Sequence, residues 1–175
     1  MDRTARSRKE GYRARSVYKL MELNGKYNLI KKGDSVFDIG CWPGSWLQFC
    51  RKKGCRVNGV DLKKTEGFDT IQGDIMKLEI EGEYDVVLSD VAPKTTGVVI
   101  LDQENSLELS RRSFEIALKI LKKNGNFLCK VFNGEDVKEL VKEVKKKFRN
   151  VKLVRADNSR RRSKEVYIVA KSYRK

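Results

Sequence analysis

Three carboxylates, Asp38, Asp61 and Asp74, interrupt or follow short apolar runs in the first half of the chain. Asp61 comes about 20 residues after a glycine turn, where an acid commonly accepts the hydroxyls of a ribose. Because the carboxyl ends of parallel strands meet at one edge of a sheet, we expect the three side chains to surround one ligand. Asp74 could then reach an adenine amino group, and Asp38 could meet an ammonium. The alternative is an ordinary α/β turn with solvated acids.

The glycine turn lies in residues 35–44, which read SVFDIGCWPG. Gly40 and Gly44 permit backbone angles and close approaches that a side chain would forbid. The dinucleotide fingerprint G-x-G-x-x-G would need glycines in place of Trp42 and Ser45, and the Trp42-Pro43 pair would obstruct a diphosphate. The turn therefore indicates a nucleoside ligand without its diphosphate, and it disfavours a nicotinamide-dependent oxidoreductase.

Two lysines differ in what their surroundings predict. Lys130 lies inside the apolar run NFLCKVF, and burying an unpaired ammonium is costly, so we expect it to point at an acid or into a cleft. Lys19 lies off the apolar face that Val17, Leu20 and Met21 form, and by this pattern alone it is a solvated surface lysine.

The elements that must position these residues alternate between strands and helices. Hydrophobic patterns predict helices near 17–24, 46–50, 103–123 and 137–148. Ser16 is a candidate cap of the first, Gly25 its stop, and Asn124-Gly125 the end of the third. Strands are predicted at 36–39, 56–60, 70–73, 84–89, 126–132, 151–154 and 166–169. Segments 61–70 and 74–84 are too short for ordinary crossover helices.

The last two strands are joined by the short polar segment ADNSRRRSKE, which favours an antiparallel pairing. The pattern therefore predicts an α/β fold with a mostly parallel seven-stranded sheet, an antiparallel last strand and helices on both faces. Glu165 would begin that last strand.

Composition indicates one domain over 1–175 and a polyanionic partner. The chain has 39 Lys and Arg against 24 Asp and Glu, a formal charge of +15, which favours nucleic acid over a membrane. We expect residues 1–13 to form a flexible basic arm. The RNA-contacting candidates are in this region and in the segment before the last strand: Arg6, Arg8, Arg13, Arg15, Arg160, Arg161 and Arg162.

Neither a signal peptide nor a membrane-spanning run is evident, so we expect a cytoplasmic protein, and a monomer. The four cysteines form no C-x-x-C pair and there is no histidine, so we expect no metal site.

Five segments in order carry a family resemblance: RSRKEGYRARSVYKLMEL, DIGCWPGSW, SDVAP, FLCKVF and RSKEVYIVA. From about residue 6 to residue 170 the chain resembles the FtsJ/RrmJ family of S-adenosylmethionine-dependent ribose 2'-O-methyltransferases. The resemblance implies a Rossmann-like methyltransferase fold. The sequence departs from the family at Cys41-Trp42, where small residues are usual, and in the short link before the fourth strand.

The resemblance also implies roles for individual residues. The family's Lys-Asp-Lys-Glu tetrad falls on Lys19, Asp90, Lys130 and Glu165. Its S-adenosylmethionine-binding positions fall on Asp38, Gly40, Trp42, Gly44, Trp46, Asp61, Asp74 and Asp90.

A ribose 2'-hydroxyl is not ionised at neutral pH, so methyl transfer needs a base and in-line placement against the sulfonium. We assign Lys130 as the base, Asp90 and Lys19 as orienting groups, and Glu165 as a support for the lysine and the hydroxyl. The expected substrate is the ribose of a uridine in large-subunit ribosomal RNA. This RNA could be naked or part of the assembled subunit. A tRNA anticodon-loop ribose is the alternative substrate, and a non-catalytic RNA-binding assembly factor is the alternative of another class.

Overall fold

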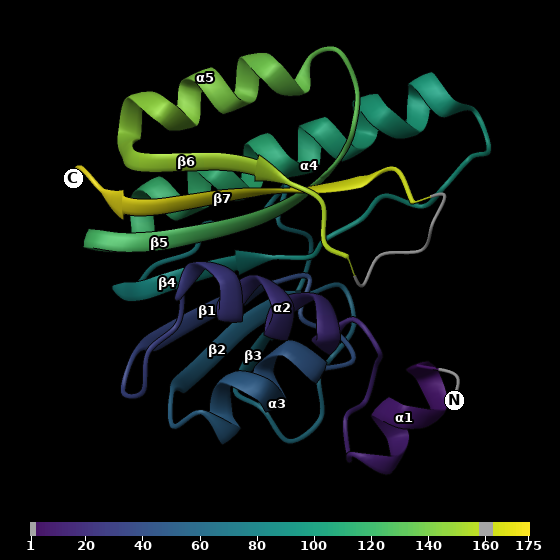
Figure 1. Ribbon diagram of the computed structural model, residues 1–175, viewed down its shortest axis with the longest axis vertical. Helices are drawn as coiled ribbons and strands as arrows, with labels where there is room; N and C mark the ends of the chain where they lie inside the picture. Colours follow the sequence, from purple (N-terminus) through teal and green to yellow (C-terminus); the bar gives the residue numbers. More distant parts are fainter. Residues whose placement is uncertain (1–2, 158–162) are drawn as a thin grey trace.

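A seven-stranded sheet in the order β3-β2-β1-β4-β5-β7-β6 forms the centre of the computed structural model, which describes residues 3–157 and 163–175 (Figure 1). All neighbouring strands are parallel except β7, which is antiparallel to both β5 and β6. The predicted fold class is confirmed. The strands are β1 (Ser35–Ile39), β2 (Arg56–Asp61), β3 (Thr70–Gln72), β4 (Tyr84–Ser89), β5 (Leu121–Phe132), β6 (Phe148–Val154) and β7 (Glu165–Tyr173).

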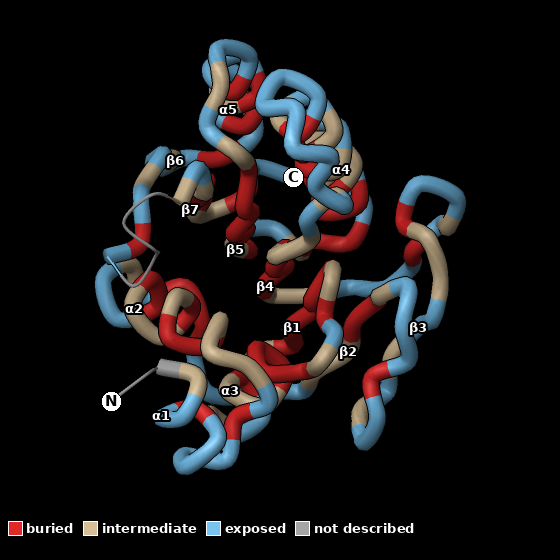
Figure 2. Tube along the Cα trace, turned by 90° about the vertical axis from the view of Figure 1, so that its right-hand side faces the viewer, coloured by how far each residue is buried: buried red, intermediate tan, exposed pale blue. Residues whose placement is uncertain are grey.

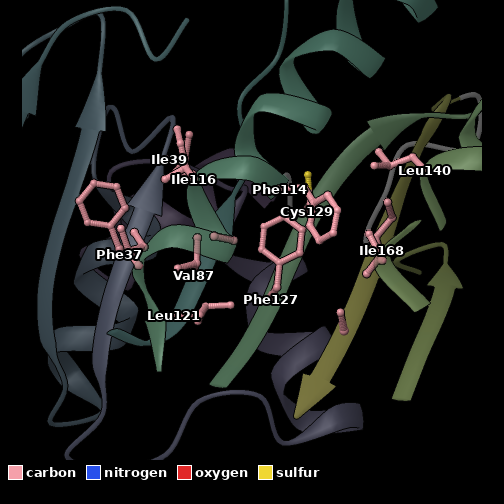
Figure 3. Packing of buried hydrophobic residues seen from close by; sticks show 14 of the residues in the cluster. Phe37, Ile39, Val87, Phe114, Ile116, Leu121, Phe127, Cys129, Leu140 and Ile168 are labelled. Carbon is pink, nitrogen blue, oxygen red and sulfur yellow. The ribbon is translucent and has the colours of Figure 1, made fainter. Parts of the chain in front are cut away.

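Helices cover both faces of the sheet. Alternate strand residues point to opposite sides, so the strands contribute buried side chains to a cluster on each face. Phe37 and Val87 pack toward α4 (Val99–Ile120) and α5 (Val137–Lys147) in one buried cluster, part of which Figure 3 shows. Val36 and Leu88 pack toward α2 (Val17–Tyr27) and α3 (Ser45–Lys52) in a second cluster. Figure 2 shows that the buried trace is concentrated in the central strands and the helix faces against them.

The sheet topology brings the strand ends that carry the site to one edge. The parallel strands β1, β2, β3, β4 and β5 finish at this edge, and antiparallel β7 begins there, because Phe132 at the end of β5 pairs with Glu165. No helix connects β2 to β3 or β3 to β4, as the short links predicted; all of these links lie in the described part of the chain.

Several helix boundaries differ from the sequence prediction. α2 continues through Gly25, which has open space around it, and ends at Tyr27, where Asn28 follows as the cap in the left-handed conformation (φ 49°). Ser16 makes no capping bond; its Oγ lies 3.0 Å from the Oγ of Ser45 instead. α4 begins at Val99, ahead of the predicted 103–123 helix, and ends at Ile120, since Leu121 already pairs with Tyr84 in the sheet.

The N-terminal segment also differs. The sequence predicted a flexible arm over residues 1–13, and the structure places a helix, α1 (Arg3–Lys9), within it. Tyr12 is buried with Val17 and Tyr18 in a small cluster, which attaches this segment to the domain.

Candidate active site

The glycine loop follows β1 in a conformation that needs glycine at its first position. Gly40 has φ 77°, and a Cβ there would lie 2.8 Å from the backbone N and Cα of Val91. The close approach brings the segment after β4 against the loop, so the ends of β1 and β4 form one wall. Gly44, with φ 104°, precedes α3, where a Cβ would lie 2.9 Å from the Thr65 methyl group.

A pocket of about 430 Å³ opens at this edge of the sheet. Asp61 lines it and is fixed by two backbone N–H groups: Trp42 donates to its Oδ2 at 3.0 Å and Lys63 to its Oδ1 at 3.0 Å. Asp74 also lines the pocket, and its Oδ1 accepts a bond from the N–H of Met76. The wall comprises Gly40, Trp42, Val60, Asp61, Leu62, Gly73, Asp74, Ile75, Asp90, Val91, Ala92, Pro93, Lys94 and Leu109.

The structure thus brings together five of the eight predicted cofactor residues. Trp42 is half-exposed, with Lys63 Nζ 4.2 Å from the centre of its ring. Gly44 and Trp46 are not among the wall residues found in the described chain. The Trp46 indole is buried on the other side of the loop, donates to the carbonyl of Ser16 at 3.0 Å and packs near Tyr167. The structure therefore gives the Trp46 side chain a place in the core rather than in the pocket.

Asp38 is fully buried below the loop, and its Oδ1 has no hydrogen-bond partner among the residues that the structure describes. Burial, followed by the charges of Asp90 and Asp61, raises the pKa of Asp38 well above its usual value. A buried, unpartnered carboxylate oxygen is costly to leave unmatched. Such an atom fits the predicted pairing with a cation.

The four tetrad residues come together from four separate elements. Lys130 is only 6% exposed, and its Nζ donates to the carbonyl of Asp90 at 2.8 Å. The same nitrogen lies 3.3 Å from Asp90 Oδ1 and 3.8 Å from Glu165 Oε1. Lys19 Nζ donates to Glu165 Oε2. Lys130 thus points at acids, one of the two placements expected from its apolar strand, and Lys19 is paired rather than solvated.

Glu165 is the shared partner of both lysines. Burial alone would raise the pKa of Glu165, but the hydrogen bond from Lys19 and the charge of Lys130 outweigh it and hold the pKa below its usual value. The carboxylate is therefore ionised at neutral pH. Ser163 adds a bond from its Oγ to Oε2 at 3.1 Å.

Tyr167 belongs to the same group, and the sequence analysis missed it. Its hydroxyl donates to Asp90 Oδ1 at 3.1 Å, and it lies opposite Lys130 in the β5–β7 register. Burial, and then the charges of Asp90 and Glu165, raise the pKa of Tyr167 well above its usual value, so it remains a donor. The only sequence signal was its place two residues after Glu165 on the same strand.

The arginines predicted to contact RNA have different surroundings. Arg13 donates from Nη1 to the carbonyls of Pro43 at 3.0 Å and Glu66 at 2.7 Å, so this group ties the N-terminal segment to the glycine loop. Arg6 pairs with Glu10 at 2.7 Å, Arg8 is exposed, and Arg15 is partly buried. Arg160, Arg161 and Arg162 lie outside the described residues.

The described ranges, residues 3–157 and 163–175, contain no group of three or more Cys, Asp or Glu side chains placed to hold a metal ion. None of their helices combines the length and apolar character needed to cross a membrane.

Comparison with known proteins decides the family. Residues 12–173 match the model of the FtsJ-like methyltransferases. The chain belongs to this family. It is 43% identical to the ribosomal RNA large subunit methyltransferase E of Archaeoglobus fulgidus, over 97% of this chain and 94% of that protein. It is 40% identical to the protein of the same name from Bdellovibrio bacteriovorus, over 95% and 93% of the two chains.

Solved structures agree with this assignment. A crystal structure described as that of a ribosomal RNA methyltransferase from Plasmodium falciparum superposes with a TM-score of 0.82. It is 29% identical and covers 93% of this chain and 98% of its own. The seven-stranded sheet with antiparallel β7 is thus the fold of an FtsJ-like methyltransferase.

Proposed function

We propose that the protein transfers the methyl group of S-adenosylmethionine to a ribose 2'-hydroxyl of large-subunit ribosomal RNA, with Lys130 as the general base. The observation that carries the proposal is the convergence of Lys130, Asp90, Glu165 and Lys19 beside a nucleoside-sized pocket. Asp90 belongs to both the pocket wall and the tetrad, so a methyl donor held in the pocket would lie next to Lys130.

The residues of the pocket fit S-adenosylmethionine. Asp61 would hold the ribose hydroxyls, Asp74 would face the adenine, and the unpartnered oxygen of Asp38 would meet the methionine ammonium. The absence of a side chain at Gly40 lets the loop lie against Val91, so that both residues line one wall of the pocket. When bound, the cofactor supplies an electrophilic methyl group on a positively charged sulfur.

Each residue of the tetrad then has its own role. Lys130 would accept the proton of the 2'-hydroxyl as that oxygen takes the methyl group that the bound cofactor would supply. Asp90 and Glu165 would stabilise the ammonium that forms on Lys130. Lys19 holds Glu165 in place, and Tyr167 holds Asp90.

The RNA class rests on the relatives, which are named for the large ribosomal subunit, and on the formal charge of +15. We propose a uridine as the target nucleotide. The test is incubation of ribosomal RNA, large subunits and tRNA with tritiated cofactor, followed by mapping of the methylated position. Label on a tRNA anticodon loop alone would favour the alternative substrate, a tRNA ribose. No label on any RNA would favour a non-catalytic assembly factor.

Replacement of Asp61 should weaken cofactor binding. Asp61→Ala removes a carboxylate that would accept two ribose hydroxyls, and a hydrogen bond to a charged group contributes roughly 1.5 to 3 kcal/mol. We expect a loss of about 2 kcal/mol in binding, measured by titration calorimetry, because the carboxylate also orders the loop through Trp42. Asp69→Ala, an exposed site bonded to Asn58, is the control. Equal affinity of the two variants would exclude Asp61 from the cofactor site.

Removal of three arginines before β7 should reduce the salt dependence of RNA binding. Replacing Arg160, Arg161 and Arg162 with alanine should lower the slope of log K against log salt by about 2 to 3 units, because each phosphate contact releases counterions. The matched control is triple alanine at Lys145, Lys146 and Lys147, at the end of α5 that leads into β6, on the sheet edge opposite Glu165. If the arginine variant keeps the wild-type slope, the segment does not contact the RNA.

A further inference from the structure

The link between β3 and β4 carries Asp74, the residue proposed to face the adenine, although the link contains no helix. It runs over residues 73–83, all of them described, and it folds into a turn in which the N–H of Leu78 donates to the Asp74 carbonyl at 3.1 Å. Gly73, Asp74 and Ile75 line the cofactor pocket. The position of this turn therefore sets the shape of the pocket where the adenine would lie.

A short turn leaves backbone carbonyls that its own N–H groups do not pair, and these carbonyls need donors from elsewhere. Arg112 of α4 supplies them. Its Nε donates to the carbonyl of Ile75 at 2.9 Å, and its Nη2 donates to the carbonyl of Leu78 at 2.8 Å. Only 14% of the Arg112 side chain is exposed, so water competes little with these charge-assisted bonds. One guanidinium thus holds the turn that follows Asp74 at two points.

The geometry of a guanidinium suits this task. Nε and Nη2 project from one edge of a rigid plane, so the two bonds fix both carbonyls relative to α4. Glu115, one turn further along α4, accepts a bond from Nη1 of Arg112 at 3.0 Å and so holds the plane in place. Leu109, one turn before Arg112, lines the pocket, whereas Arg112 is not among the wall residues of the described chain. Arg112 would therefore act on the cofactor through the turn and not by direct contact.

We propose that Arg112 is a positioning residue of the cofactor site, which fixes the turn that presents Asp74 to the adenine amino group. The inference rests on the proposed function, because it starts from an adenine at Asp74. Without the guanidinium, the carbonyls of Ile75 and Leu78 lose their donors, and the turn is free to move away from α4. The buried side chains of Ile75 and Ile80 still attach the link to the core. The loss should therefore appear in adenine recognition more than in folding.

Two ligands that differ only in the amino group test this role. S-adenosylhomocysteine carries the adenine amino group, and its deaminated analogue carries a hydrogen there, which cannot donate to Asp74. The wild-type protein should bind the first about 10-fold more tightly, close to the contribution of one hydrogen bond to a charged group. In Arg112→Met this preference should fall to about twofold or less, because Asp74 is no longer held against the amino group. Titration calorimetry with both ligands gives the ratio of Kd values, which a general loss of stability would leave unchanged.

The neighbouring arginine provides the matched control. Arg111, with 38% of its side chain exposed, pairs with Glu143 of α5 at 2.7 Å, so Arg111→Met should keep the wild-type preference. Arg112→Lys retains the charge but offers one nitrogen to two carbonyls, so its preference should be intermediate. This lysine variant also carries the test if the methionine variant does not fold.

The outcomes separate this role from the proposed function. Arg112 variants that keep the wild-type preference, or an Arg111→Met variant that loses it equally, would overturn the inference. Equal binding of the two ligands by the wild-type protein would refute the placement of the adenine at Asp74, and with it this role. A wild-type protein that binds neither ligand would refute the cofactor assignment in the proposed function.

Discussion

Lys130→Arg should fold and bind cofactor but transfer methyl groups at least about 100-fold more slowly than the wild-type protein, the factor expected of a general base. Arginine keeps the positive charge and can still pair with Asp90 and Glu165, but its guanidinium does not give up a proton. The measurement is a single-turnover rate at saturating cofactor and RNA, which separates chemistry from binding and product release.

Lys130→Met serves as the companion variant. It should lose activity to the same extent, yet its free energy of unfolding need not fall, because an apolar chain of similar length replaces a buried charge. Lys138→Arg, on the exposed face of α5, should leave the rate unchanged. A Lys130→Arg rate above about a tenth of wild type would show that Lys130 only pairs with the acids and shapes the site.

The base role places Lys130 between two acids. Its side chain is buried, and its Nζ lies 3.3 Å from Asp90 Oδ1 and 3.8 Å from Glu165 Oε1. Lys19 donates to Glu165 and so shares that carboxylate with Lys130. The tetrad therefore holds the Lys130 nitrogen in place through both acids.

The strands of the sheet were predictable because burial dictates their composition. β1 and β4 are central strands with buried, β-branched or aromatic residues, and their predicted positions agree with the structure. The start of α4 was not predictable in this way. Val99 and Ile100 are exposed at its N-terminus, so they show no apolar periodicity toward a core.

The assembly of the site could be predicted only in part. Lys19 and Glu165 are 146 positions apart, and nothing in their local sequence pairs them; the family resemblance supplied both. Tyr167 was missed because its role depends on the β5–β7 register, which sets it opposite Lys130. Arg13 was assigned to RNA because its segment is basic, and that assignment stays a prediction. Its bonds to the carbonyls of Pro43 and Glu66 could not be predicted, because backbone acceptors leave no signal in side-chain type.

Asp38→Asn should have opposite effects on stability and on cofactor binding. Burial raises the pKa of Asp38 in the folded chain, so the folded state holds this proton more tightly than the unfolded state. Stability must then fall as pH rises from the unfolded pKa toward the folded pKa. Asparagine cannot ionise, so the variant should gain stability relative to wild type as pH rises above the ordinary pKa of an aspartate, measured by urea unfolding without cofactor.

Asp85→Asn gives the control of opposite sign. Burial alone would raise the pKa of Asp85, but hydrogen bonds from Ser35 and Lys122 outweigh it and lower that pKa, so this carboxylate stabilises the fold above its unfolded pKa. Asp85→Asn should therefore be less stable than wild type by a constant amount above the unfolded pKa, and this deficit should shrink as pH falls through the folded pKa. The gain of Asp38→Asn should instead grow as pH rises above the unfolded pKa. Parallel trends in the two variants would show that Asp38 is not held protonated by its surroundings.

The cost of Asp38→Asn should appear when the cofactor binds. In the proposed complex the unpartnered Oδ1 of Asp38 pairs with the methionine ammonium of the cofactor. Asp38→Asn removes the charge of this pair, so it should weaken cofactor binding by about 3 kcal/mol, or roughly 150-fold. Because a bound cation favours the ionised acid, wild-type binding should release the proton of Asp38, and calorimetry in buffers of different ionisation enthalpy should detect it. A variant that binds as tightly as wild type, with the same proton release, would remove Asp38 from the ammonium site. A variant that is more stable but binds the cofactor weakly would show that the buried carboxylate serves ligand binding and lowers the stability of the protein without cofactor.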